Sequence, residues 1–271
     1  MALGDLVTEF WKFEFNGFSF GAATDYDVIE VQDLAGFQAR SDSVTRFGRH
    51  GGSGGRHYAE MKNITIKGHV LCTSDTDYRT KRMAMATAFK PIKDPADAIP
   101  LVMTLPGADM LKLQCKARPL RLDLPWDRGA ALKYPKYDIR MELLDPVLYS
   151  LTEHQSAFVF PTDTNTINNA GHEDTHWQLS IVGPATNPIV TNEDTGQFLS
   201  FSNLILNGSQ ILTLDSFDST AKVNGTSVAN YFTEGFSWWS LPPGNTDITV
   251  EATTALSGSA LLTWRDAYWT P

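Results

Sequence analysis

The segment His172-Glu173-Asp174-Thr175-His176 holds the residues with the clearest chemical potential in the chain. Two histidines four apart, the first followed by glutamate, bind zinc when they lie on one face of a helix. The surrounding residues, however, predict strands and loops, where residues four apart do not converge as they do on a helix. We therefore expect no metal site here.

No other group of residues predicts catalysis. No serine lies in a Gly-x-Ser-x-Gly turn between a strand and a helix, which is the context of a nucleophile elbow. Cys72 and Cys115 both lie in apolar-periodic segments, which favours free, buried thiols in a reducing cytoplasm over the alternative of a disulfide. Acid pairs such as Asp215 and Asp218 are turn-like, and a glycosidase needs carboxylates that the fold brings together. We expect a protein that is not an enzyme and binds no cofactor.

Residues 51–55 form a glycine-rich run flanked by Arg46, Arg49 and Arg56. Such a loop cradles phosphate when a strand precedes it and a helix follows, but here a strand is predicted at 64–70. The pattern instead predicts a long hairpin whose flexible tip lies at Gly51–Gly55. The hairpin either contacts a neighbouring chain through its arginines or is a solvated loop.

Trp238 and Trp239 are adjacent aromatic residues in the second half of the chain. In a β-sandwich, neighbouring residues of a strand face opposite sides, so one is expected to be buried and the other exposed. An exposed tryptophan can serve as a platform for a sugar ring, and Trp239 is our candidate. A core or interface tryptophan is the alternative.

The distribution of charge divides the chain near residue 150. Residues 1–150 carry 20 Lys and Arg against 19 Asp and Glu, whereas residues 151–271 carry 2 against 12, a net charge of −10. An acidic second half argues against nucleic-acid binding there. The start lacks the pattern of a secretory signal, and no stretch approaches membrane-spanning length. We predict two domains, 1–150 and 151–271.

The strand at Tyr137–Leu143, followed by Asp145-Pro146, closes the first domain, since apolar and polar residues alternate along it and proline then ends it. Further strands are predicted at 26–32, 101–105 and 111–117. One helix is expected from Ser74 to about Lys90, with a buried face formed by Tyr78, Arg82, Met85 and Phe89. The first domain is therefore predicted to be α+β, with one helix on a sheet.

The second domain shows short strands separated by turn residues and no helical period. This pattern predicts an antiparallel β-sandwich. The chain is thus expected to be mainly β.

An aromatic hairpin opens the chain, with Asn16-Gly17 as its tight turn. Trp11, Phe13 and Phe15 are expected to share one face. That face forms either part of the core or a subunit interface, where aromatic residues are also enriched.

Taken in order, several stretches resemble the distal tail proteins of long-tailed (siphovirus-type) bacteriophages, also called minor tail proteins. These stretches are the opening hairpin, the glycine-broken hairpin before 64–68, the junction at 143–149, and the segments 167–171, 187–190, 195–196, 241–248 and 264–269. The resemblance extends over nearly the whole chain through the order of these motifs.

The resemblance implies a structural virion protein at the tail tip, assembled in the host cytoplasm. Proteins of that family form a homohexameric ring between the tail tube protein and the tail-tip hub, next to the tape measure protein. DNA passes through the channel without specific binding, and the second domain is a galectin-like β-sandwich that holds other baseplate parts. A carbohydrate-binding module that recognises host-surface glycans is the alternative function.

On this basis we hypothesise that the ring interface is built by the aromatic face of the opening hairpin and by the glycine-broken hairpin. The candidate residues are Trp11, Phe13, Phe15, Phe47, Arg49, Arg56 and Tyr58. Since a duplex should slide through the channel, the arginines are expected to point away from it.

Overall fold

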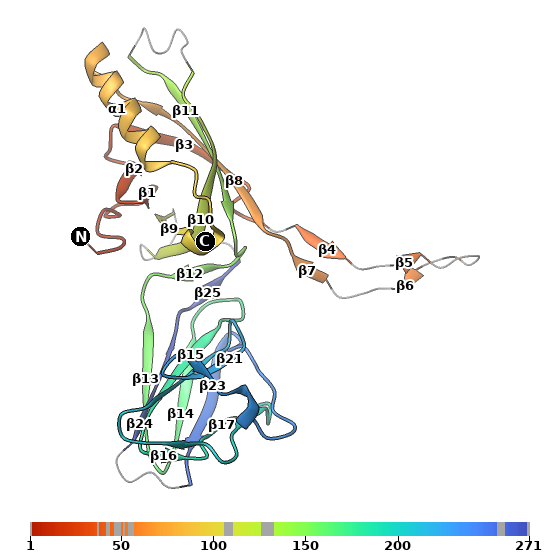
Figure 1. Cartoon of the computed structure of the whole chain (residues 1–271). Helices are drawn as coiled ribbons and strands as arrows, with labels where there is room; N and C mark the ends of the chain where they lie inside the picture. The colour runs from red at the N-terminus through yellow and green to blue at the C-terminus, as the bar shows by residue number, and fades with distance from the viewer. Residues whose placement is uncertain are drawn as a thin grey trace. The chain divides into compact units, whose positions relative to one another are not determined.

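The computed structural model describes residues 2–36, 38–41, 44–45, 50, 52–53, 57–105, 111–125, 133–253 and 258–269. It divides into two compact units (Figure 1). The first unit consists of Met1–Leu151 with Trp269–Pro271, and the second of Thr152–Tyr268. The return of the last residues to the first unit has no counterpart in the sequence-based boundary at 150.

The first unit is built on one antiparallel sheet with the strand order β2-β1-β9-β10-β11-β8-β3, to which β12 adds by pairing with β10. The bounds are β1 Lys12–Phe15, β2 Phe18–Gly21, β3 Tyr26–Gln32, β8 Lys62–Val70, β9 Ile99–Thr104, β10 Lys112–Asp123, β11 Lys136–Leu143 and β12 Leu148–Ser150. The predicted strands are therefore present. β10 extends beyond residue 117, where the predicted strand ends. A bulge beside Pro119 accommodates this residue, which has no backbone N–H to donate to the neighbouring strand.

The hairpin of β1 and β2 turns at Asn16 and Gly17, whose φ angles of 52° and 70° are the positive values that a tight two-residue turn needs. The rings of Phe13 and Phe20 stack 5.3 Å apart. The other face of β1 is also buried, because Glu14 Oε2 accepts hydrogen bonds from the backbone N–H groups of Gly4 (3.0 Å) and Leu6 (3.3 Å). Alternation along the strand places Glu14 on the face opposite Phe13 and Phe15, and the structure buries both faces.

The sheet of the first unit curls, so that its two edge strands approach each other. The rings of Phe18 in β2 and Tyr26 in β3 lie 4.6 Å apart. Trp11 Nε1 donates a 2.6 Å hydrogen bond to the carbonyl of Val28. The register of β3 shifts after Val28, and this bulge leaves Ile29 exposed.

The predicted helix is present as α1 (Asp75–Ala88), with Ser74 Oγ accepting the N–H of Asp77 as the N-cap. Tyr78, Met85 and Phe89 are buried as expected from their spacing. In the described part of the chain it is the only α-helix, accompanied by the 3₁₀-helices η1 (Pro95–Asp97) and η3 (Ala229–Tyr231).

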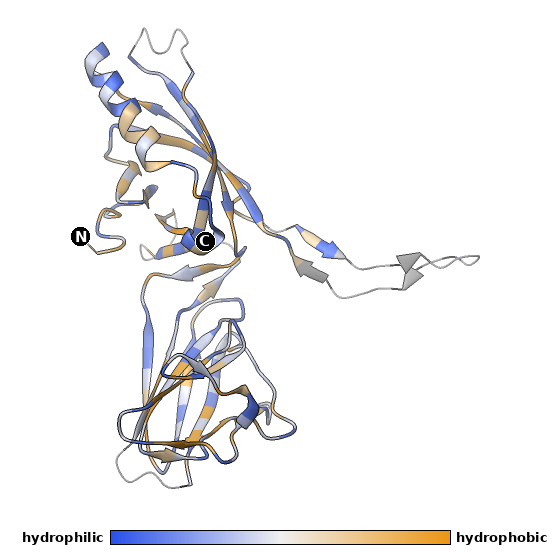
Figure 2. Cartoon of the chain, in the orientation of Figure 1, coloured by the Kyte–Doolittle hydropathy of each residue, from blue (hydrophilic) through white to orange (hydrophobic). Residues whose placement is uncertain are grey.

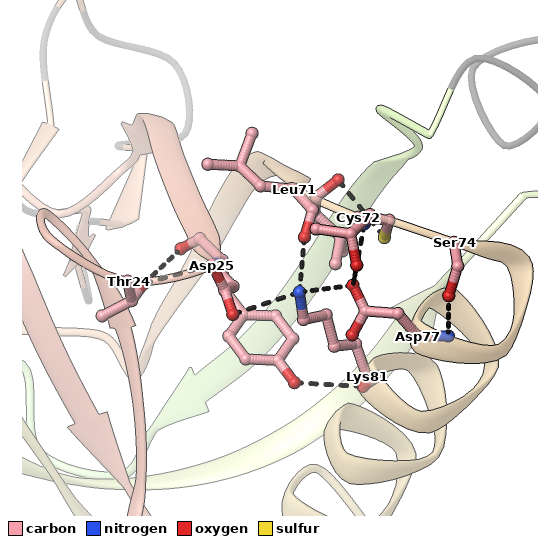
Figure 3. Close-up of polar contacts among 10 residues, drawn as sticks. Thr24, Asp25, Leu71, Cys72, Ser74, Asp77 and Lys81 are labelled. Atoms are coloured by element: carbon pink, nitrogen blue, oxygen red, sulfur yellow. Dashed lines mark hydrogen bonds and ion pairs between the residues drawn. The ribbon is translucent and has the colours of Figure 1, made fainter.

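Lys81 attaches α1 to the segments beside it (Figure 3). Its ammonium group donates to the carbonyl of Leu71 (2.7 Å) and lies 2.8 Å from Asp77 Oδ2 and 3.1 Å from Asp25 Oδ2. Tyr26 Oη donates to the carbonyl of Lys81 itself. These contacts hold one side of α1 against the segments beside it, and Phe89 packs at the C-terminal end of the helix.

A hairpin lies between β3 and β8 in the sequence, as predicted. β4 (Ala39–Ser41) pairs with β7 (His57–Ala59), and β5 (Val44–Thr45) pairs with β6 (Gly52–Ser53). Gly52 and Ser53 therefore belong to an arm of the hairpin, and the predicted tip at Gly51–Gly55 is wrong. Glycine supplies conformational freedom but does not by itself exclude strand pairing.

The second unit is a sandwich of two antiparallel sheets, ordered β13-β24-β15-β20-β21-β22 and β14-β23-β17-β18, with a small pair β16-β19. The bounds are β13 His154–Val159, β14 Thr162–Asn169, β15 Trp177–Val182, β16 Ala185–Thr186, β17 Ile189–Asn192, β18 Phe198–Ser200, β19 Ile205–Leu206, β20 Ile211–Asp215, β21 Thr220–Val223, β22 Thr226–Ser227, β23 Gly244–Glu251, β24 Ser259–Trp264 and β25 Ala267–Tyr268.

Both sheets of the second unit contribute to one hydrophobic core. Leu179 and Ile181 enter it from β15, and Ile248 and Val250 enter it from β23. Hydrophobic and hydrophilic residues are interspersed along these strands (Figure 2). The prediction of a mainly β chain with a single helix in its first domain is confirmed for the described residues.

Candidate functional site

The structure buries two of the residues that we had placed at a ring interface. Phe13 and Phe15 are 1% and 0% exposed, and the ring of Phe15 stacks on that of Phe89 at 5.3 Å. Phe89, directly after α1, covers Phe15 within the same chain. Phe13 and Phe15 are therefore core residues and offer no surface to a neighbouring chain.

Trp11 is half-buried at the start of β1, where its φ of 61° directs the chain into the strand. Its indole N–H is bonded to Val28, so only part of its ring is free for a neighbour. Phe47, Arg49 and Arg56 lie outside the described residues. Tyr58 lies in β7 opposite Arg40, and only its backbone is described.

The two histidines of the zinc-like motif diverge in the structure. The segment is extended and forms β-bridges at Glu173 and Thr175. His172 packs against Tyr268 with ring centroids 5.4 Å apart, and His176 packs against Phe217 at 4.9 Å. Within the described ranges, no three His, Cys, Asp or Glu residues gather as metal ligands.

The two cysteines are free thiols. Burial raises the pKa of the Cys115 thiol to about 12, and this side chain is 3% exposed. Cys72 is only half-buried, in contrast to the prediction, and burial again raises the pKa of its thiol. Neither cysteine has the depressed pKa of a reactive thiolate.

The second unit carries a groove of ≈ 490 Å³ that includes both adjacent tryptophans; we call it the Trp238 groove. Its lining residues are Asp174, His176, Thr195, Gln197, Ser216, Trp238, Trp239, Ser240 and Pro242. Four segments far apart in the sequence form it: the loops before β15, β18 and β23, and the residue after β20.

The structure gives the two tryptophans the reverse of the roles that we predicted. Trp239, the candidate sugar platform, is 7% exposed, whereas Trp238 is half-buried. Their segment is not a strand, so they do not face opposite sides. Both rings lie near that of buried Trp177, at centroid distances of 5.1 Å for Trp239 and 6.2 Å for Trp238.

Polar side chains around the groove are held by neighbouring groups. Asp174 Oδ2 accepts a 2.8 Å hydrogen bond from Ser240 Oγ. Gln197 Nε2 donates to Ser237 Oγ at 3.1 Å, and Gln197 Oε1 accepts from Thr195 Oγ1 at 3.1 Å. The groove therefore presents a fixed carboxylate and a fixed amide beside an indole ring.

Sequence reasoning did not predict this grouping. Asp174 was considered only as a spacer between two histidines, and Gln197 was not considered at all. Neither residue lies in a motif, and only the packing of the loops brings them to Trp238. The adjacent tryptophans were the one signal available.

Sequence comparison relates the second unit to phage tails. Residues 170–268 match the family model described as siphovirus-type tail component, C-terminal domain. The resemblance to siphovirus tail proteins is confirmed. The matched residues begin directly after β14 and end in β25, so they cover most of the second unit. The search among curated proteins gives no match.

The fold of the whole chain is similar to that of the Dit protein of SPP1, whose crystal structure is described as a paradigm of the hub adsorption apparatus in phages that infect Gram-positive bacteria. The TM-score is 0.69 at 17% identity, over 94% of this chain and 98% of that chain. The activated, calcium-containing baseplate of phage P2 also matches, with a TM-score of 0.49 at 8% identity over 93% of this chain and 97% of that chain. In the described part of this chain, no helix has the length and apolar character needed to cross a membrane.

Proposed function

We propose that this protein is a structural component of a siphovirus-type tail, in which six copies form a closed ring that joins the tail tube to the tail-tip hub. The observation that carries the proposal is the agreement in fold with SPP1 Dit over nearly the full length of both chains. The family match of residues 170–268 supports it independently. In this role the protein binds its neighbours and catalyses no reaction.

Its partners in this proposal are further copies of itself, the tail tube protein, the tail-tip hub protein and the tape measure protein. DNA crosses the channel without specific contacts, in keeping with the near balance of charge in residues 1–150. The second unit, as a galectin-like sandwich, holds other baseplate proteins. The tail tip of the virion is the site of action, after assembly in the host cytoplasm.

A closed ring needs two different patches on each subunit that complement each other. Exposed apolar side chains on the first unit, Ile29 in the bulge of β3 and Leu120 in β10 among them, are available for such contacts. With Phe13 and Phe15 assigned to the core, the remaining proposed interface residues are Trp11, Phe47, Arg49, Arg56 and Tyr58.

Native mass spectrometry of the purified chain tests the ring. We expect a species of six subunits, formed alone or after addition of the tail tube and tail-tip hub proteins. A chain that stays monomeric at high concentration under both conditions contradicts the proposal.

The proposed hairpin contact is tested by the double charge reversal Arg49→Glu with Arg56→Glu. We expect this variant to lose the hexamer in light scattering, because two cations of a heterologous interface become anions. Lys222→Glu, which reverses an exposed charge in β21 of the second unit, is the control and should leave the hexamer intact. A hexamer that survives the double change shows that these arginines are not at the interface.

A further inference from the structure

We infer that the Trp238 groove of the second unit is a binding site for a neutral saccharide, a property separate from ring formation. Five features of the groove carry this inference: its aromatic side chain, its polar side chains, an unpaired imidazole nitrogen, its charge and its dimensions.

The aromatic feature is the indole of Trp238, which is fixed and half-buried. Trp177 lies beside it at 6.2 Å, and Phe232 meets it edge-on at 6.0 Å with an interplanar angle of 81°. Its backbone carbonyl accepts a hydrogen bond from Gln197 Nε2. A rigid, partly exposed ring with a polar edge is a low-entropy surface on which the C–H face of a pyranose can pack.

The polar feature is the pair of planar groups beside this ring. The carboxylate of Asp174 is exposed, yet its orientation is set by Ser240. The amide of Gln197 is set by Ser237 and Thr195. Sugar hydroxyls both donate and accept, so a carboxylate and an amide in fixed positions can bond adjacent hydroxyls without a large loss of side-chain entropy.

His176 adds an observation of another kind. Its Nδ1 is buried and has no hydrogen-bond partner among the described residues, while its ring lies edge-on against Phe217. An unpaired buried nitrogen has a free-energy cost that structures seldom retain without a reason. His176 lines the groove, so a ligand or water bound there that donates to Nδ1 would remove that cost.

Charge decides the class of ligand. Asp174 is the only formally charged residue among the lining residues, which include no Lys or Arg. Residues 151–271 carry a net charge of −10. A phosphate or uronate ligand would therefore be repelled, since no cation is present to compensate its charge. A neutral oligosaccharide meets no such penalty.

The dimensions agree with a short oligosaccharide. A volume of ≈ 490 Å³ lies within the usual range of small-molecule sites. The lining combines polar side chains with two tryptophans, which suits a ligand that has both hydroxyl groups and apolar C–H faces. We therefore expect two or three sugar units to be accommodated.

The test uses the full-length chain on a glycan array that displays neutral and anionic oligosaccharides. The best neutral ligand is then titrated by saturation-transfer NMR, with glucose 1-phosphate as the anionic comparison. We expect neutral glycans to bind and glucose 1-phosphate not to bind. If no neutral glycan binds, or if only anionic glycans do, the inference is wrong.

Two variants locate the site. Asp174→Asn keeps an exposed polar group of the same shape, so it should fold, and it should weaken binding at least about tenfold through loss of a charged acceptor. Trp238→Ala should abolish binding. Phe10→Ala, which removes an exposed aromatic side chain from the first unit, is the matched control and should bind as the natural chain does. Unchanged binding in both groove variants refutes this location, whatever the oligomeric state.

Discussion

Phe89 lies directly after α1, and its ring connects the helix to the aromatic hairpin. It is 3% exposed. It stacks on Phe15 at 5.3 Å with an interplanar angle of 8°, and it meets Phe18 and Phe20 edge-on at 5.8 and 5.6 Å. We predict that Phe89→Ala destabilises the first unit strongly and leaves the second unit unchanged.

The magnitude follows from these contacts. Truncation of a buried phenylalanine to alanine usually costs about 3–5 kcal/mol of folding free energy. Each favourable aromatic pair adds roughly 0.5–1.5 kcal/mol beyond area burial, and Phe89 makes three such pairs. The hydrogen bond from the Phe89 N–H to the Met85 carbonyl is kept by alanine. We therefore expect a loss of about 4 kcal/mol, a large share of the stability of an ordinary domain.

Hydrogen–deuterium exchange at increasing urea concentrations, analysed by peptide mass spectrometry, measures the two units separately. Peptides from α1 and β1 should lose about 4 kcal/mol of protection, whereas peptides from β15 and β20 should not change. Met83→Ala is the control, because Met83 lies on the same helix but is 62% exposed. It should change stability by less than about 0.5 kcal/mol.

Two results would refute this reasoning. A loss below about 1 kcal/mol in the first unit would mean that the aromatic cluster contributes little to attaching the helix. An equal loss of protection in β15 and β20 would mean that the two units unfold together, which would contradict the expectation that units with separate cores unfold separately.

The other predictions concern the thiols and the helix start. A thiol reagent at mild alkaline pH should label Cys72 in the native chain, and Cys115 only after denaturation, because burial raises the pKa of the Cys115 thiol to about 12; labelling of both in the native chain would contradict its burial. Hydrogen bonds from Lys81 and from the backbone of Thr73 lower the pKa of Asp77 from 3.8, so its contribution to stability is present above pH 3.8 and is lost as the pH falls below that value. Asp77→Asn should lower the thermal midpoint at neutral pH and flatten its fall in acid, and an unchanged acid profile would count against this assignment.

Local patterns predicted those parts of the fold whose cause is local. The oxygen of Ser74 and the three-to-four spacing of Tyr78, Arg82, Met85 and Phe89 are sufficient to place α1. Asn16-Gly17 is likewise sufficient to place the first turn, because few other residue pairs adopt two positive φ angles at low cost.

Local patterns failed where distant segments decide the outcome. Glu14 follows the alternation of a solvent-facing residue, yet the N-terminal segment folds over it and donates two backbone N–H groups. Trp239 is buried because residues 237–240 pack as a loop against Trp177, and an alternation rule holds only for strands. The Trp238 groove depends on the same kind of packing, so its polar residues could not be identified before the fold was known.

The two proposals for this protein draw on residues of different units, and this makes them separable. Every residue of the Trp238 groove belongs to the second unit, whereas the proposed ring contacts belong to the first. Each unit also has its own core, so a surface substitution in one should leave the other folded. Trp238→Ala should therefore form the hexamer without binding glycans, and the Arg49→Glu, Arg56→Glu variant should bind glycans as a monomer. A surface variant that lost both properties at once would show that binding requires the assembled ring, for example through avidity of six weak sites, rather than a complete site in each chain.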